Sequence, residues 1–300
     1  MRAEIESLPD GTTRFEDVLD DDGRGNRDLP IAASVTVDGD SLTVDFAGTA
    51  DQTAGPVNAV FAVTASATYF AVRAVTDPDI PPNAGCYRPV DIETPPASLV
   101  DAAPPAAVVG GNLETSQRVT DVVLGAFARS VPERAVAGCQ GTMNNVTFGG
   151  TDPRTGDPFA FYETQGGGFG AHSAGDGMDG VHVHMSNTLN TPVEVLETAY
   201  PLRVRRYELR PDSGGDGEFR GGLGLRRDVE LRAPATFSLL ADRYDHAPYG
   251  LGGGDAGATG AAFLLDGERE RLPAKTVRDL SEGTVVSLRT PGGGGYGDPE

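Results

Sequence analysis

Three of the four histidines in the chain, His172, His182 and His184, lie in the glycine-rich stretch Gln165–Thr188. In the segment VHVHMSN, residues 181–187, the two-residue period of a strand would place His182 and His184 on one face. Two imidazoles on one face can bind a metal ion or share a proton transfer. The alternative is a half-buried strand that shows its histidines to solvent or to neighbouring carboxylates. The clustering of histidines favours a functional role.

Carboxylates and amides flank these histidines in the sequence. Asp176 and Asp179 lie in the preceding glycine loop, which could fold back and bring them to the imidazoles. The segment SNTLNTPVEVLE, residues 186–197, supplies Asn and Thr side chains for carbonyl contacts and a carboxylate that could orient a histidine. An ordinary turn, whose asparagines bond their own backbone, is the alternative. The predicted catalytic set is His172, His182, His184, Asp176, Asp179 and Glu194, the predicted substrate-binding set is Asn112, Asn187 and Thr191, and no metal ligands are predicted.

The second half of the chain must hold most of these residues on a β-rich framework. From Gly138 onward, short apolar runs such as VTFGG, FAFYET, LRVRRYELR and TVVSLRT alternate with Gly, Pro and Asp. Strands separated by turn signals at this spacing are typical of a sandwich or a barrel-like sheet. The segment VHVHMSN is expected to be another of these strands.

The first half of the chain mixes strands and helices. The segment SVTVDGDSLTVDF, residues 34–46, predicts a β-hairpin with one buried face, and the residues before it are expected to be loop-like. Residues 58–75 predict a largely buried helix, and the Pro-rich stretch Pro78–Pro105 predicts extended chain and turns. A second helix is predicted within residues 110–131, with Asn112 or Thr115 as its cap.

These patterns together predict an α+β fold that is rich in short strands, with sandwich or barrel-like sheets and a few buried helices. We expect a mixed part over residues 1–137 and a β-rich part over residues 138–300, intertwined in one unit.

Charge and composition exclude several classes of function. The formal net charge of -20 disfavours binding to nucleic acids and to anionic membranes, because both are negatively charged and bind surfaces rich in Lys and Arg. Lys275 is the only lysine, a pattern that favours adaptation to high intracellular salt over a merely acidic protein. No apolar run has the roughly 20 residues that a membrane span needs, and the first residues lack the apolar core of a signal peptide, so we expect a cytoplasmic protein.

Signatures of cofactors are weak. The sequence has no GxxxxGK[ST] motif, and its three GxGxxG matches, which begin at Gly175, Gly252 and Gly292, do not join an expected strand to a helix. Cys86 and Cys139 are far apart, so a structural zinc site or redox pair is not expected. Cys139, in AGCQGTMNN, is interpreted as a small buried residue, with a nucleophile as the alternative. We expect no nucleotide and no metal to be bound by this chain alone.

Long and compositionally unusual segments give the chain a family resemblance. They include DFAGTADQTAGPVNA, DPDIPPNAGCYRP, GGNLETSQRVTD, DGVHVHMSNTLNTPVEVLE, YPLRVRRYELRPDSGGDGEFRGGLGLRRD and TPGGGGYGDP. In this order they resemble the C-terminal half of the hydantoinase B/oxoprolinase family, over nearly the whole chain. The resemblance implies an ATP-dependent opening of a cyclic amide, such as 5-oxoproline or a hydantoin. It also implies a partner: an A-type subunit that binds ATP and phosphorylates the substrate.

The resemblance also implies what is expected elsewhere in the complex. Family members carry an N-terminal half with a segment like NDPYxGGTH, to which a metal site is attributed, and that segment is absent here. We therefore expect ATP and a divalent metal to be bound elsewhere, with the N-terminal half of a B-type subunit as a second partner. The alternatives are a subunit of an enzyme like the acetone and acetophenone carboxylases, and a non-catalytic assembly module or truncated remnant.

Overall fold

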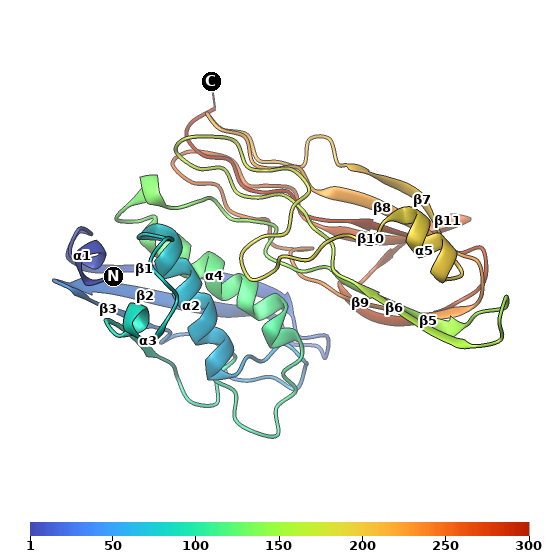
Figure 1. Ribbon diagram of the computed structural model, residues 1–300, viewed down its shortest axis with the longest axis horizontal. Helices are drawn as coiled ribbons and strands as arrows, with labels where there is room; N and C mark the ends of the chain where they lie inside the picture. Colours follow the sequence, from blue (N-terminus) through green and yellow to red (C-terminus); the bar gives the residue numbers. More distant parts are fainter. Residues whose placement is uncertain (300) are drawn as a thin grey trace.

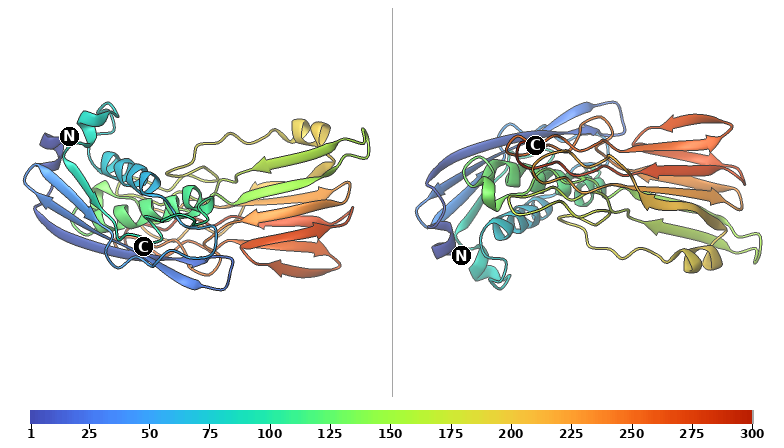
Figure 2. Two further views of the ribbon diagram at one scale, coloured as in Figure 1. Left: turned by 90° about the horizontal axis from the view of Figure 1, so that it is seen from below. Right: turned by 90° about the horizontal axis from the view of Figure 1, so that it is seen from above.

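Two hydrophobic cores, one toward each end of an elongated molecule, organise the fold (Figure 1). The structure is a computed structural model, and it describes residues 1–299. The first core draws its buried side chains from residues 5–131 and the second from residues 146–288. Figure 2 shows extended segments that run from the strands of the second part and continue alongside the helices of the first part. The fold is α+β, as the sequence predicted.

The first part is a four-stranded sheet whose strand order is β1-β2-β3-β4. Its strands are β1 (Gly11–Asp21), β2 (Arg27–Asp38), β3 (Ser41–Asp45) and β4 (Val90–Glu93). The predicted hairpin is confirmed, because β2 and β3 pair antiparallel around Gly39, whose φ of 55° suits a tight turn. Along these strands Val35, Val37, Leu42 and Val44 are buried on one face.

The prediction that the first thirty residues form loops is wrong. Strand β1 pairs with β2 from Gly11 to Asp21. It was missed because its polar sequence shows no simple alternation of apolar residues. Asp20 near its end and Asp22 just beyond it are fully buried carboxylates that are satisfied by hydrogen bonds.

The helices of the first part stack on this sheet. They are α1 (Arg2–Ile5), α2 (Phe61–Val75), α3 (Ala84–Tyr87), η1 (Gly110–Asn112), α4 (Glu114–Phe127) and η2 (Pro132–Arg134). Helix α4 packs on β1 and β2, and α2 packs on α4 (Figure 1). Both long helices were predicted. The predicted cap of α4, Asn112 or Thr115, is wrong, because Leu113 occupies the cap position and no side chain caps the helix. Every residue of α4 is buried, including its charged ones.

The second part is a sandwich of two antiparallel sheets. One sheet has the order β11-β10-β13-β8-β7 and the other β12-β9-β5-β6. Phe148 and Phe237 of one sheet share the second core with Val286 and Leu288 of the other. The elements are β5 (Asn145–Thr151), β6 (Pro158–Glu163), α5 (Val193–Ala199), β7 (Leu202–Leu209), β8 (Leu225–Leu231), β9 (Ala235–Leu240), β10 (Ala261–Asp266), β11 (Glu268–Leu272), β12 (Lys275–Leu280) and β13 (Val285–Arg289).

Glycine-rich segments join the two parts through their backbones. We call them the glycine bundle: residues 165–180, 213–224, 250–260 and 291–297. Gly222 N donates to Phe169 O at 2.8 Å, and Gly293 N donates to Gly222 O at 2.9 Å. A Cβ on Gly293 would lie 2.0 Å from Phe169 O, so these chains can approach this closely only without side chains. The central glycines of the GxGxxG matches, Gly177, Gly254 and Gly294, are packed against backbone in the same way.

Within residues 1–299, no helix is both long enough and apolar enough to cross a membrane.

Candidate functional site

A pocket of about 330 Å³ lies where the start of α4, strand β6 and the segment 185–191 meet. Its lining includes Asn112, Asn187 and Thr191, the three residues that the sequence predicted for substrate contacts. The rest of the lining is Leu113, Met143, Tyr162, Glu163, Thr164, Met185, Ser186, Thr188 and Leu189. Residues from four separate parts of the sequence thus converge on one concave surface, which we call the seam pocket.

Glu163 at the end of β6 anchors the wall of the seam pocket. One carboxylate oxygen accepts a hydrogen bond from Thr191 N at 2.7 Å. The other accepts from Gln165 Nε2 at 2.9 Å and is paired with the buried Arg227. Because both of its oxygens are occupied by these partners, Glu163 is a structural carboxylate that fixes the segment carrying Asn187 and Thr191.

A chain of hydrogen bonds runs from the seam pocket into the interior. Tyr162 Oη donates to Asn145 Oδ1 at 2.7 Å, and Asn145 Nδ2 donates to Glu114 Oε1 at 2.7 Å. Complete burial raises the pKa of Glu114 to about 8, against the opposing hydrogen bond from Thr142. The Glu114 carboxyl is therefore mostly protonated at neutral pH. Tyr162 is 56% exposed, and the partial burial of its hydroxyl raises its pKa, so the hydroxyl stays protonated.

His182 lies beside the same pocket. Its Nδ1 is 3.1 Å from Oγ of the lining residue Ser186, and its Nε2 is buried without a hydrogen-bond partner in the described chain. Burial lowers the pKa of His182, although the charge of Glu163 opposes this. A neutral imidazole in this position can accept a proton.

His184 does not share a face with His182, so the predicted strand VHVHMSN is wrong. Only Val181 forms a β-bridge there, and His184 has a φ of 48°, which breaks the alternation of a strand. The side chain of His184 instead enters the interior, where Nε2 meets Asp121 Oδ1 at 3.0 Å. Tertiary contacts select this conformation, including Gln117 Nε2, which donates to Val183 O at 3.1 Å.

The pair of His184 and Asp121 is charged. Burial opposes charge on both groups, but the hydrogen bond from His184 and the nearby Arg243 hold the pKa of Asp121 below its usual range. In the same way burial alone would lower the pKa of His184, and the neighbouring Cys139 and Asp121 raise it. Arg243 NH2 completes the arrangement at 2.8 Å from Asp121 Oδ2.

His172, Asp176 and Asp179 belong to the glycine bundle, and none of them lines the seam pocket. His172 Nδ1 accepts from Ala174 N within its own turn at 3.2 Å. Asp176 accepts from Arg220 N at 2.9 Å, and Asp179 accepts from Leu223 N at 2.7 Å. These two aspartates therefore link segment 165–180 of the glycine bundle to segment 213–224. Within residues 1–299, neither aspartate is hydrogen-bonded to a histidine.

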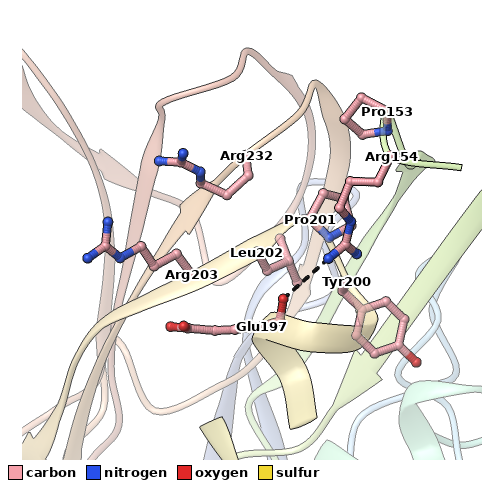
Figure 3. Close-up of a pocket in the computed structure, with 8 residues that line it drawn as sticks. All are labelled: Pro153, Arg154, Glu197, Tyr200, Pro201, Leu202, Arg203 and Arg232. Carbon is pink, nitrogen blue, oxygen red and sulfur yellow. Dashed lines mark hydrogen bonds between the residues drawn. The ribbon is translucent and has the colours of Figure 1, made fainter. Parts of the chain in front are cut away.

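Glu194 lies on the exposed first turn of α5, away from the seam pocket. A separate hollow of about 390 Å³ opens between α5 and the strands at the far end of the sandwich (Figure 3). Its lining includes Arg154, Arg203 and Arg232, and Figure 3 shows Arg154 reaching the backbone of Glu197. Arg154 also pairs with Asp152 at 2.6 Å. Because the same arginine donates to backbone carbonyls of α5, it links this helix to the turn that carries Asp152.

Sequence reasoning missed Glu114, Tyr162 and Asp121. A signal for two of them was present in GGNLETSQRVTD, because Glu114, Gln117 and Asp121 recur at helical spacing and share a face of α4. Polar residues at that spacing in a helix that proves to be fully buried mark an interior polar network. Tyr162 gave no such signal, since an isolated tyrosine in a strand is typical of an exposed position.

Known proteins match the chain along nearly its whole length. The sequence model for hydantoinase B/oxoprolinase matches residues 1–299. The chain is 42% identical to 5-oxoprolinase 1 of Arabidopsis thaliana, with 95% of this chain and 22% of that protein covered. It is 35% identical to a candidate B component of a D-/L-hydantoinase from a Pseudomonas species, covering 100% of this chain and 52% of that component.

A solved structure has the same fold. The ATP-dependent caprolactamase from Pseudomonas jessenii superposes with a TM-score of 0.86 at 29% identity, over 99% of this chain and 53% of that one. The chain thus spans about half of the hydantoinase component and of the caprolactamase chain, and a smaller share of the plant 5-oxoprolinase.

Proposed function

The chain belongs to the hydantoinase B/oxoprolinase family, and on that premise we propose that it is a component of an ATP-dependent cyclic amide hydrolase. The proposed substrate is a small ring such as 5-oxoproline or a hydantoin. The names of its relatives support this class, because 5-oxoproline, hydantoins and caprolactam share an amide bond within a ring.

The observation that carries the proposal is the convergence of Asn112, Asn187 and Thr191 on the seam pocket. At about 330 Å³ the pocket lies at the lower end of the range for small-molecule sites, which is roughly 300–1,000 Å³. Amide and hydroxyl groups from these three residues would hydrogen-bond the carbonyl and N–H groups of a cyclic amide. The apolar side chains of Leu113, Met143 and Met185 would contact its ring carbons.

Opening an activated cyclic amide requires three kinds of group from the protein. Hydrogen-bond donors must stabilise the carbonyl oxygen as it gains charge, a base must take a proton from the attacking water, and an acid must protonate the departing nitrogen. We assign the first role to Asn112 and Asn187. Neutral His182 serves as the base, acting on a water held near Ser186.

Tyr162 is placed to serve as the acid. Its side chain lines the pocket, and its hydroxyl proton is bonded to Asn145 Oδ1 before the reaction. That proton would leave this bond to reach the departing nitrogen, and the proton that His182 takes from water would return to the tyrosinate through solvent. Glu114 acts as a positioning residue, because its hydrogen bond to Asn145 Nδ2 sets which end of that amide faces Tyr162. A protonated Glu114 can do this in the interior without the cost of an isolated buried charge.

The remaining roles belong to partners. We propose that ATP and a divalent metal are bound by an A-type subunit and by the portion of the family architecture that this chain does not cover. We also keep the division near residue 137 as a proposal, with the mixed part contributing Asn112 and the β-rich part contributing Tyr162 and Asn187. A site assembled across that division would respond to partners on either side of it.

The test is turnover by the reconstituted complex. The chain is co-purified with an A-type subunit and the family's N-terminal portion, and ADP release is measured with 5-oxoproline, a hydantoin and caprolactam. We expect release that depends on one of these rings, with a matching yield of the opened product. The double change of Asn112 and Asn187 to Ala should lower kcat/KM by about 100-fold, since each lost hydrogen bond costs roughly 1–1.5 kcal/mol.

Asn190→Ala is the matched control, because Asn190 lies in the same exposed segment but does not line the pocket. The proposal is wrong if the double variant keeps full activity in an active complex. ATP-dependent carboxylation of a ketone would favour the carboxylase alternative. Unchanged turnover by the partners without this chain would indicate a non-catalytic assembly module.

A further inference from the structure

Three potential metal ligands of different chemistry meet in the interior next to the seam pocket. They are a carboxylate oxygen of Asp121, the Sγ of Cys139 and an imidazole nitrogen of His184, and these atoms all lie within 4.8 Å of one another. They come from α4, from the segment after residue 137 and from the segment after the glycine bundle. We propose that they bind one divalent transition-metal ion of the zinc class.

The donor set selects the type of metal. A thiolate, an imidazole and a carboxylate together suit a borderline-soft ion such as Zn²⁺ or Co²⁺. Mg²⁺ and Ca²⁺ prefer oxygen ligands throughout and would not favour the sulfur. Separations of up to 4.8 Å exceed those in a tetrahedral site, whose metal–ligand bonds of about 2.0–2.3 Å bring ligand atoms closer together. Binding would therefore draw the three side chains inward.

An unpartnered buried nitrogen points independently to a ligand. The side chain of His184 is only 1% exposed, yet its Nδ1 has no hydrogen-bond partner in the part of the chain that the structure describes. Buried polar atoms almost always have a partner, so such an atom needs an explanation. Its other nitrogen, Nε2, is hydrogen-bonded to Asp121 Oδ1 at 3.0 Å, and metal binding by Asp121 would replace this contact.

Cys139 supplies the sulfur ligand from the interior. Cys139 is fully buried, and its Sγ accepts a hydrogen bond from Gly170 N at 3.2 Å. The thiolate is the form of cysteine that binds metal ions. The glycine bundle makes this contact possible, because a Cβ on Gly170 would clash with Ala137 O at 1.9 Å.

The shell around the ligands restricts the site. Arg243 NH2 donates to Asp121 Oδ2 at 2.8 Å and restricts the carboxylate, while Tyr249 Oη donates to the backbone carbonyl of Asp121 at 2.7 Å and holds the main chain there. The rings of Phe70 and Phe169 lie 5.9 Å from the imidazole. Metal ions bind cysteine as the thiolate and histidine as the neutral imidazole, so binding at this site would release protons.

This site is separate from the proposed reaction and from the metal expected elsewhere in the complex. None of the three ligands lines the seam pocket. The metal would tie α4 to the β-rich part, and it would hold His184 in its left-handed conformation two residues from His182. Its role would be to stabilise the junction that carries the pocket.

Cobalt provides a direct test on the full 300-residue chain. The protein is purified with chelator and reductant, freed of both, and titrated with Co²⁺ at pH 8 while the near-ultraviolet spectrum is recorded. We expect a thiolate-to-cobalt charge-transfer band that saturates at one ion per chain and is displaced by Zn²⁺. The band should be absent in Cys139→Ser and kept in Cys86→Ser, which changes the only other cysteine.

Two further measurements keep the proposal testable if Cys139→Ser does not fold. Zn²⁺ should raise the melting temperature of the wild-type chain, and it should protect Cys139 from alkylation after partial unfolding while leaving Cys86 reactive. His184→Gln should lose at least 10-fold in Zn²⁺ affinity, as expected for a lost ligand. A folded wild-type chain that shows no charge-transfer band, or a band equal to that of Cys139→Ser, would overturn the site. None of these readouts depends on cyclic amide turnover.

Discussion

The glycine bundle and the seam pocket are neighbours in sequence but are built on opposite principles. In the bundle, four segments approach until backbone meets backbone, and the contacts are N–H to carbonyl bonds such as Gly168 N to Pro291 O at 3.0 Å. In the pocket, side chains from distant segments supply the wall, and the backbone only sets their positions. The stretch Gln165–Thr188 begins in one region and ends in the other.

This difference shows that the most conspicuous motifs in the sequence are not the residues that can do chemistry. The glycines match nucleotide-binding patterns, yet a Cβ on Gly177, inside the match that begins at Gly175, would lie 2.0 Å from Phe169 O, so this glycine serves packing. The polar groups that can do chemistry, such as Glu114 and Tyr162, lie in segments that look like an ordinary helix and an ordinary strand. Substitutions in the bundle should therefore change stability, and substitutions in the pocket should change activity.

Gly293→Ala should have the largest effect, because the new Cβ would lie 2.0 Å from Phe169 O and both sides of the contact are backbone. We expect a loss of about 3 kcal/mol or more in unfolding free energy, or no folded protein, since overpacked interiors relax poorly. Chemical denaturation followed by circular dichroism measures it. Gly175→Ala is the matched control, with only the His172 ring nearby at 3.7 Å. Equal stability of the two variants would remove the distinction between packed and open glycines.

Glu114→Gln tests, through the pH dependence of the unfolding free energy, whether the buried carboxyl beside the seam pocket is protonated. The pKa of Glu114 rises from an ordinary 4.5 to about 8 on folding, so the folded state holds this proton more tightly than the unfolded state. The group therefore stabilises the fold fully below pH 4.5, and this contribution falls by about 1.4 kcal/mol per pH unit until it is lost above pH 8.

Denaturant titrations between pH 5 and pH 9 measure this dependence. The wild type should lose stability over that range, and Glu114→Gln should lose less. The same slope in both proteins would mean that Glu114 is not protonated in the fold. In the reconstituted complex, the variant should weaken activity through Tyr162 while leaving the protein folded.

Asp179→Ala should have an intermediate effect that is confined to stability. It removes the acceptor for Leu223 N at 2.7 Å and for Arg220 NH1 at 3.0 Å, at a side chain that is 31% exposed. We expect a loss of about 1–2 kcal/mol in unfolding free energy. Turnover per folded molecule should not change, and Asp216→Ala in an exposed neighbouring loop position is the control. A selective loss of kcat would return Asp179 to the catalytic set.

Glu194→Gln should have the smallest effect. The side chain is exposed on the first turn of α5, away from the seam pocket. We expect unchanged melting temperature and unchanged kcat/KM in the complex. A clear fall in kcat/KM would support the orienting role that the sequence suggested.

Much of the fold followed from periodic patterns. The hairpin β2–β3, the helices α2 and α4 and most strands of the sandwich were predicted, because each buries one regular row of apolar residues. Strand β1 and the irregular course of residues 181–187 were not. Both depend on buried polar groups, Asp20 in one case and the pair of His184 and Asp121 in the other, and their partners are distant in the chain.

The sequence alone determined the α+β class, the family, the location of Asn112, Asn187 and Thr191 among the polar residues of interest, and the absence of a P-loop motif. Only the tertiary structure decided that these three line one pocket, that His182 and His184 do not share a face, and that Glu114 becomes a neutral acid. The reason is physical: local patterns fix which face of a segment is buried, whereas the pKa and partners of a side chain depend on groups that folding brings from elsewhere.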